Sequence, residues 1–174
     1  FDLVKLANMN GLYIAELAHE KFVQIAWDYA ARYEWRASAP KGLFENVAAL
    51  MQSRTKTLAD IATWQYFFTD SYIYDQKALR KHLAGEPFRK AVSELAAALD
   101  GAKASEILPS RVEELIHSVE DANGIQHGKL NQSVRVAVTG VTVGAGVYET
   151  VGILGAGKSA ARIRSTLSMP VQAC

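Results

Sequence analysis

The chain has 174 residues, of which 49% are hydrophobic and 21% are charged, so it is long and apolar enough to bury a core and is not a disordered segment. Lys and Arg number 19 and Asp and Glu number 18, so net charge alone indicates no nucleic-acid partner. The single cysteine is Cys174, which excludes an internal disulfide framework and a thiolate metal cluster and favours a cytoplasmic protein.

Apolar residues recur every three or four positions along the chain, and the alternating pattern typical of strands is nearly absent. This spacing predicts an all-α fold. No apolar stretch approaches the roughly 18 residues needed to cross a bilayer, so we expect no membrane span. The first residue is Phe1 rather than Met, which favours a piece of a longer protein.

The first predicted subdomain comprises residues 1–56. Apolar residues within 3–17 and within 22–30 recur at helical spacing and predict two short helices. Pro40 breaks the pattern, and the residues after it predict a third helix. Polar residues then interrupt the apolar pattern at 52–56, so we place the subdomain boundary there.

The second predicted subdomain comprises residues 57–174. Thr57 and Asp60 have the spacing of a capping box ahead of an apolar run, which predicts that a helix begins here. Asp75 and Pro109 are typical of two further helix starts. Together with the apolar stripes between them, these signals predict five or six helices in a compact bundle.

Residues 152–159 match G-x-x-x-x-G-K-[ST], the pattern of a loop that binds nucleotide phosphates. Such a loop needs a strand before it, a helix after it and an acidic residue for magnesium on a later strand. No Asp or Glu follows Ser159, and no parallel sheet is predicted. We therefore interpret Gly155 as the end of one helix and Lys158 as the opening of the next. A nucleotide-binding protein using residues 152–159 is kept as an alternative function.

Charge is uneven along the second subdomain. Residues 128–174 contain five Lys and Arg against one Glu, a basic segment that fits contact with phosphates. The acidic residues of 111–127 are Glu113, Glu114, Glu120 and Asp121. We interpret them as an exposed helix face rather than as catalytic groups. The four histidines lack the spacing of a zinc site, and a helical protein-interaction domain with a basic tail is a second alternative.

Three stretches match, in order, segments of one enzyme family. Residues 1–14 match F-D-x-x-K-L-x-W-M-N-x-x-Y-I except at the tryptophan, and residues 50–58 match L-x-x-x-R-x-x-T-L. Residues 128–140 match G-K-x-x-Q-P-x-R-x-A-x-T-G except at the proline, and residues 144–155 are similar to P-G-x-F/Y-E followed by L-G. In this order and spacing the chain resembles the C-terminal half of bacterial glutamyl-tRNA synthetases, which are class I aminoacyl-tRNA synthetases.

The resemblance implies a helical bundle or cage of the class I anticodon-binding type and a set of RNA contacts. Arg54 takes the position of an arginine that contacts the first anticodon base, and Arg135 that of an arginine that approaches the anticodon. The further anticodon contacts it implies are Thr139, Gly140, Gly144, Ala145, Gly146 and Val147. Lys129 and Arg162 are expected to contact the tRNA backbone. We expect the guanidinium groups of Arg54 and Arg135 to converge on one anticodon.

The resemblance also implies the role of each subdomain within a longer parent enzyme. Residues 1–56 would be a connecting, stem-contact subdomain and residues 57–174 the anticodon-binding subdomain. The parent would ligate glutamate to glutamate tRNA in an ATP-dependent reaction, with ATP and magnesium in the missing catalytic half, because the signatures H-I-G-H and K-M-S-K-S are absent here. For this fragment we expect glutamate tRNA as partner, a monomer, no membrane association, and no cofactor, metal or catalytic residue.

Overall fold

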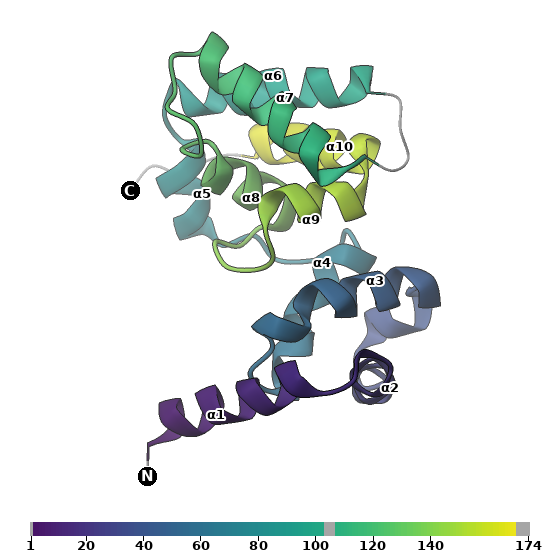
Figure 1. The fold of residues 1–174 in the computed structure, drawn as a ribbon. Helices are drawn as coiled ribbons and strands as arrows, with labels where there is room; N and C mark the ends of the chain where they lie inside the picture. Colours follow the sequence, from purple (N-terminus) through teal and green to yellow (C-terminus); the bar gives the residue numbers. More distant parts are fainter. Residues whose placement is uncertain (1, 103–106, 170–174) are drawn as a thin grey trace. The chain divides into compact units, whose positions relative to one another are not determined.

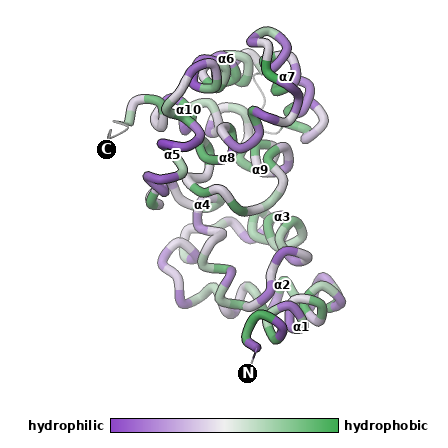
Figure 2. The backbone as a smooth tube through the Cα atoms, turned by 90° about the vertical axis from the view of Figure 1, so that its left-hand side faces the viewer, coloured by the Kyte–Doolittle hydropathy of each residue, from purple (hydrophilic) through white to green (hydrophobic). Residues whose placement is uncertain are grey.

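The computed structural model describes residues 2–102 and 107–169, and every regular element within them is helical (Figure 1). The prediction of an all-α fold is confirmed. The chain divides into two compact units, Phe1–Tyr72 and Ile73–Cys174. Among the described residues, none of the helices combines the length and the apolar character that a bilayer crossing requires, and hydrophilic and hydrophobic residues are interspersed along the helices (Figure 2).

In its described residues, the first unit consists of short α-helices and three 3₁₀ turns. The α-helices are α1 (Leu3–Glu16), α2 (His19–Ala30), α3 (Lys41–Met51) and α4 (Gln65–Phe68), and the 3₁₀ turns cover Glu34–Ser38, Gln52–Arg54 and Leu58–Trp64. Asp2 caps the start of α1, where its carboxylate accepts hydrogen bonds from the amides of Val4 and Lys5 at 3.0 Å.

Trp64 lies at the centre of the core of the first unit. Its side chain is fully buried, and its ring centroid lies 6.2 Å from that of Phe22 on α2 and 5.7 Å from that of Phe44 on α3. The 3₁₀ turn that follows residue 57 therefore folds together with the preceding helices. The predicted boundary after residue 56 differs from the observed division after Tyr72, because aromatic packing joins the next segment to the first unit.

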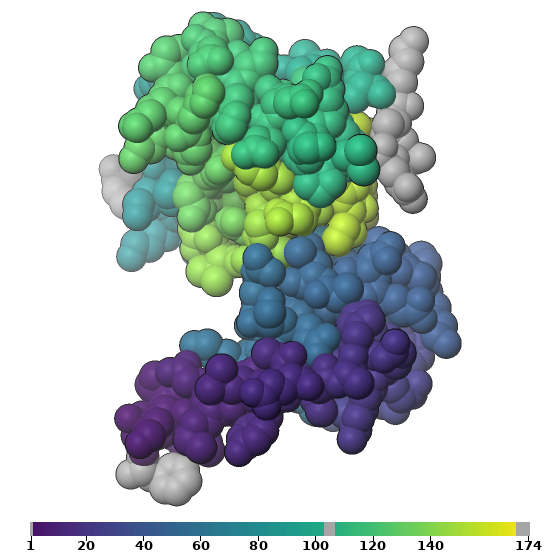
Figure 3. Space-filling view, viewed as in Figure 1, coloured from purple at the N-terminus to yellow at the C-terminus, as the bar shows by residue number. Residues whose placement is uncertain are grey.

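α1 is attached to its unit mainly through its C-terminal half. Asn10 donates a hydrogen bond to the carbonyl of Lys56, and a Cβ added to Gly11 would lie 3.3 Å from Cγ of Lys56. Ile14 is the buried residue of this helix. Figure 3 shows this N-terminal helix, drawn in purple, on the surface of the first unit. The exposed large apolar side chains of α1 are Leu3, Val4, Leu6, Met9, Leu12 and Tyr13.

The second unit is a helical bundle. Its described helices are α5 (Gln76–Leu83), α6 (Phe88–Gly101), α7 (Pro109–Ala122), α8 (Asn131–Thr139), α9 (Val147–Leu154) and α10 (Ala156–Ser168). α10 packs against α6, α8 and α9, while α7 packs against α6 and α9 (Figure 1). Leu99, Ile116 and Ile163 are fully buried among these helices. The bundle expected from apolar spacing is present, and it begins after Tyr72.

The prediction that Glu120 lies on an exposed acidic face of α7 is wrong. Its side chain is fully buried, and its carboxylate accepts hydrogen bonds from the amides of Gly128 at 3.1 Å and Leu130 at 2.8 Å. Glu114, by contrast, is exposed and pairs with Arg111 at 2.7 Å. The buried carboxylate of Glu120 is therefore satisfied by two backbone amides and fixes the turn that leads into α8.

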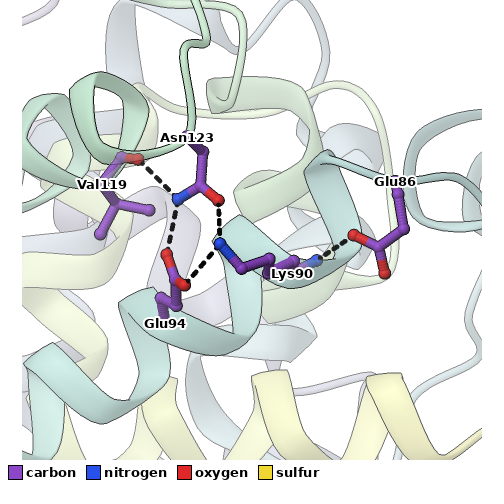
Figure 4. A network of polar contacts seen from close by, with 5 residues as sticks. All are labelled: Glu86, Lys90, Glu94, Val119 and Asn123. Atoms are coloured by element: carbon purple, nitrogen blue, oxygen red, sulfur yellow. Dashed lines mark hydrogen bonds and ion pairs between the residues drawn. The ribbon is translucent and has the colours of Figure 1, made fainter.

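A polar network joins α6 to the end of α7 (Figure 4). The carboxylate of Glu94 accepts a hydrogen bond from Nδ2 of Asn123 at 2.5 Å and pairs with Lys90 at 3.1 Å. Asn123 accepts from Nζ of Lys90 at 2.9 Å and donates to the carbonyl of Val119 at 2.9 Å, while the Lys90 amide donates to Glu86 at 3.1 Å. The hydrogen bonds from Asn123 and Lys90 lower the pKa of Glu94.

This network predicts that the effect of Glu94→Gln depends on pH. Because the pKa of Glu94 is lowered in the folded chain, its contribution to stability is present above the ordinary pKa and disappears as the pH falls through the lowered one. We expect the variant to have a lower Tm than the parent at neutral pH, with the gap closing below about pH 4. Circular dichroism melts across this range measure it. A difference in Tm between the parent and Glu94→Gln that stays constant in acid would contradict a stabilising role for the ionised Glu94 carboxylate.

Candidate nucleic-acid interface

Most of the residues expected at the anticodon lie on α8, in the loop that follows it, or at the first residue of α9. α8 is terminated by Gly140, whose φ of 78° is left-handed and whose amide donates to the carbonyl of Val136 at 2.9 Å. The hydroxyl of Thr139 donates to the carbonyl of Arg135 at 2.8 Å and accepts from the amide of Val141 at 3.3 Å. These bonds fix the last turn of α8 and the start of the loop.

Arg135 connects α8 to the far end of the same loop. Its guanidinium is half-buried and donates through Nη1 to the carbonyl of Ala145. A Cβ added to the next residue, Gly146, would lie 2.0 Å from Oε2 of Glu149, so glycine at this position leaves room for that carboxylate at the N-terminus of α9. Arg135 thus orders the loop in addition to the anticodon contact expected of it.

The residues of 139–147 that are expected at the anticodon differ in exposure. The buried members are Thr139, Gly140, Ala145 and Val147. This burial includes their backbone atoms, so the structure leaves these four residues little surface for the RNA contacts expected of them, whereas Gly144 and Gly146 are half-buried. Val143 is 81% exposed and was missed by the sequence reasoning. No motif marks it, but an exposed apolar side chain in a loop suits packing against an unstacked base.

Arg54 lies in the first unit, at the end of a 3₁₀ turn. Its side chain is exposed, and Nη1 donates to the carbonyl of Leu50 at 3.0 Å. The residues that follow are held in place: Thr55 is buried, and Nζ of Lys56 donates to Oδ1 of Asn8 on α1 at 2.8 Å. The backbone is therefore fixed while the guanidinium faces solvent, which suits a residue that contacts RNA.

The two residues expected at the tRNA backbone differ in exposure. Lys129 lies two residues before the start of α8 and is exposed, as a phosphate contact requires. Arg162 is only 5% exposed and donates through Nη1 to the carbonyl of Val138 at 2.9 Å. The prediction for Arg162 is corrected, because a guanidinium held inside the bundle cannot reach an RNA phosphate without leaving its site.

Residues 152–159 do not form a phosphate-binding loop. Gly155 ends α9 with φ 80° and ψ 159°, and α10 begins directly after it at Ala156. Within residues 2–102 and 107–169 no strand precedes this segment. The interpretation of Gly155 as a helix end is confirmed, although α10 begins before Lys158. A nucleotide-binding function for this motif is therefore not favoured.

The fold and the family comparison agree on the class of protein. Residues 14–167 match the family model described as an anticodon binding domain, and the chain belongs to this family. A glutamate–tRNA ligase of Symbiobacterium thermophilum is 33% identical over 162 residues, which cover 89% of this chain and 32% of the ligase. One from Thermobifida fusca is 33% identical over 174 residues, which cover 96% of this chain and 36% of the ligase.

Solved structures show the same fold. The crystal structure of a glutamate tRNA ligase from Elizabethkingia meningosepticum, in complex with its amino acid, matches 96% of this chain with a TM-score of 0.78 and 21% identity. The glutamate–tRNA synthetase of Elizabethkingia anophelis matches 97% with a TM-score of 0.73 and 19% identity. The match covers 32% of each of these two chains, so this chain spans about a third of the length of its relatives.

Proposed function

We propose that this chain is the anticodon-binding part of a glutamate–tRNA ligase and that it recognises the anticodon of glutamate tRNA. The observation that carries the proposal is the family match over residues 14–167, combined with relatives that are glutamate–tRNA ligases along nearly all of this chain. The exposed guanidinium of Arg54 and the ordered loop from Gly140 to Val147 supply suitable contact chemistry.

Guanidinium groups suit this task because they pair through two hydrogen bonds with a base edge or a phosphate and also stack on bases. In the proposal Arg54 binds the first anticodon base. Arg135 approaches the anticodon while it holds the loop through Ala145. The half-buried Gly144 and Gly146 let backbone groups approach an unstacked base closely.

The rest of the reaction belongs to other parts of the proposed parent enzyme. That enzyme would attach glutamate to the tRNA with ATP and magnesium bound outside this chain, and it would act in the cytoplasm as a monomer. In the described residues, the segment that matches a phosphate-loop pattern is two helices joined at Gly155. The residues of this chain would bind and orient the anticodon and take no part in bond formation.

A gel-shift titration tests the proposal. The chain is titrated with a glutamate tRNA transcript and with the same transcript carrying an altered anticodon. We expect clearly tighter binding of the unaltered transcript. Equal Kd values would reduce the chain to an RNA-binding surface without anticodon recognition, and absent binding would favour a protein-interaction domain.

Lys129 provides a test of the phosphate contact. Lys129→Ala should weaken binding of both transcripts to a similar degree and reduce the slope of log Kd against log salt by about 1, since one phosphate contact is lost. Titrations at several salt concentrations give the slope. Lys21→Ala, at an exposed position on α2, is the control and should leave the slope unchanged. An unaltered slope for Lys129→Ala would remove this residue from the interface.

A further inference from the structure

Arg162 is a buried cation on α10, and contact with RNA does not explain its presence there. A buried charge is costly unless hydrogen bonds satisfy it. The Nη1 of Arg162 donates to the carbonyl of Val138 at 2.9 Å. Because the side chain is only 5% exposed, this bond to α8 indicates a specific task inside the bundle.

That task concerns the C-terminus of α8. The last four carbonyls of a helix have no partner within the helix, and the final turn of α8 is buried, so other groups must satisfy them. α10 provides two of these groups: Arg162 reaches Val138, and the hydroxyl of Thr166 donates to the carbonyl of Ala137 at 2.9 Å. Residues four apart lie on the same side of a helix, so one face of α10 caps α8. A cation at this end also complements the helix dipole.

The capped end of α8 lies between Arg135 and the candidate anticodon loop. Arg135 lies one helical turn before Thr139, and the hydroxyl of Thr139 donates a hydrogen bond to the carbonyl of Arg135. Gly140 follows the capped carbonyls and opens the loop, and its own carbonyl accepts from the amide of Asp75 at 2.9 Å. A displacement of the last turn of α8 would therefore move Arg135 and the start of the loop together.

We propose that Arg162 is a positioning residue that holds the end of α8, and through it the loop from Gly140 to Val147, in the conformation that reads the anticodon. The proposal rests on the proposed function of the same site. Arg162 acts from the interior and does not touch RNA. Its loss should affect the preference for the native anticodon more than the attraction to phosphates.

The binding test uses Arg162→Met, Arg162→Lys and the control Arg164→Met, which removes a half-exposed arginine that pairs with Asp100 on α6. Arg162→Met should lower the ratio of Kd values for altered and native glutamate tRNA at least tenfold and keep the parent's salt slope. Arg162→Lys retains a cation and should restore part of the ratio. Arg164→Met should keep the parent's ratio.

Hydrogen exchange of the free chain provides a second measurement, independent of RNA. The amides of residues 138–141, at the end of α8 and the start of the loop, should exchange at least tenfold faster in Arg162→Met, while those of Phe88–Gly101 in α6 exchange as in the parent. If Arg162→Met does not fold, Arg162→Lys is measured in its place and should show the same pattern in weaker form.

The outcomes separate the two proposals. If the parent's Kd values for the altered and the native tRNA were nearly equal, the proposed function would be refuted, and the exchange of residues 138–141 would still decide the role of Arg162. A folded Arg162 variant with the parent's Kd ratio and the parent's exchange at residues 138–141 would overturn the positioning role. A reduced salt slope would show a phosphate contact instead, and equal acceleration of exchange at residues 138–141 and in α6 would show a purely structural role.

Discussion

Arg54→Gln is expected to lower the preference of the chain for the native anticodon by about 1–3 kcal/mol, the range for losing one good bidentate contact to a base. The physical reason is that Arg54 is exposed on a fixed backbone, so its guanidinium can pair with a base edge in a way that an amide cannot match. The measurement is the Kd of a transcript altered only at the first anticodon base divided by the Kd of native glutamate tRNA. This ratio should fall about fivefold to 150-fold.

The control for this experiment is Arg111→Gln. Arg111 is an exposed arginine that pairs with Glu114 on α7, and it has no expected RNA contact. It should leave the ratio of Kd values unchanged. If Arg54→Gln weakens binding of both transcripts by the same factor, Arg54 contacts the RNA without reading the base.

Trp64→Ala should destabilise the first unit by about 3–5 kcal/mol, the usual cost of removing a large aromatic side chain from a core. Trp64 is fully buried and packs against Phe22 and Phe44, so the vacated volume cannot be filled by a small shift. Urea unfolding followed by tryptophan fluorescence measures the change. The tryptophans of the chain all lie in the first unit, and the variant retains Trp27 and Trp35 as reporters.

Leu12→Ala is the matched control for the core substitution. Leu12 is 67% exposed on α1, and its truncation should change the free energy of unfolding by no more than about 0.5 kcal/mol. If Trp64→Ala also changed it so little, residues 57–72 would not belong to the core of the first unit.

The sequence predicted helix starts and ends well where contacts between residues close in sequence determine them. Thr57 and Asp60 form the expected capping box, although the helix that they open is a 3₁₀ turn. Asp75 caps α5 through the amides of Lys77 and Ala78. Gly155 ends α9 as predicted. Such signals depend on neighbours a few residues away, so a single sequence contains them.

The errors concern properties that depend on distant residues. Nothing in the spacing of Glu120 distinguishes it from Glu114, but only Glu120 faces the amides of the turn before α8. Arg162 and Arg164 both add to the basic count of the C-terminal segment, yet Arg162 is buried and Arg164 exposed. Charge counted along a sequence cannot separate a capping cation from a phosphate contact, because burial is decided by tertiary packing.

The candidate site was predicted chiefly through motif resemblance. Arg54 has no local feature that would separate it from an ordinary exposed arginine, whereas the pattern around residues 50–58 marks its position in the family. The structure adds that Arg135 bonds Ala145 and that Thr139 bonds Arg135, contacts that no spacing rule predicts. Val143 carries no motif, and only its exposure draws attention to it.

Nucleotide-resolved footprinting of glutamate tRNA with this chain tests anticodon recognition most directly. We expect the three anticodon nucleotides to be protected from chemical cleavage in the parent complex. Arg54→Gln should weaken protection at the first anticodon base, and Arg162→Met should weaken it across the anticodon. Protection confined to other parts of the tRNA, with the anticodon fully reactive, would contradict the proposed function.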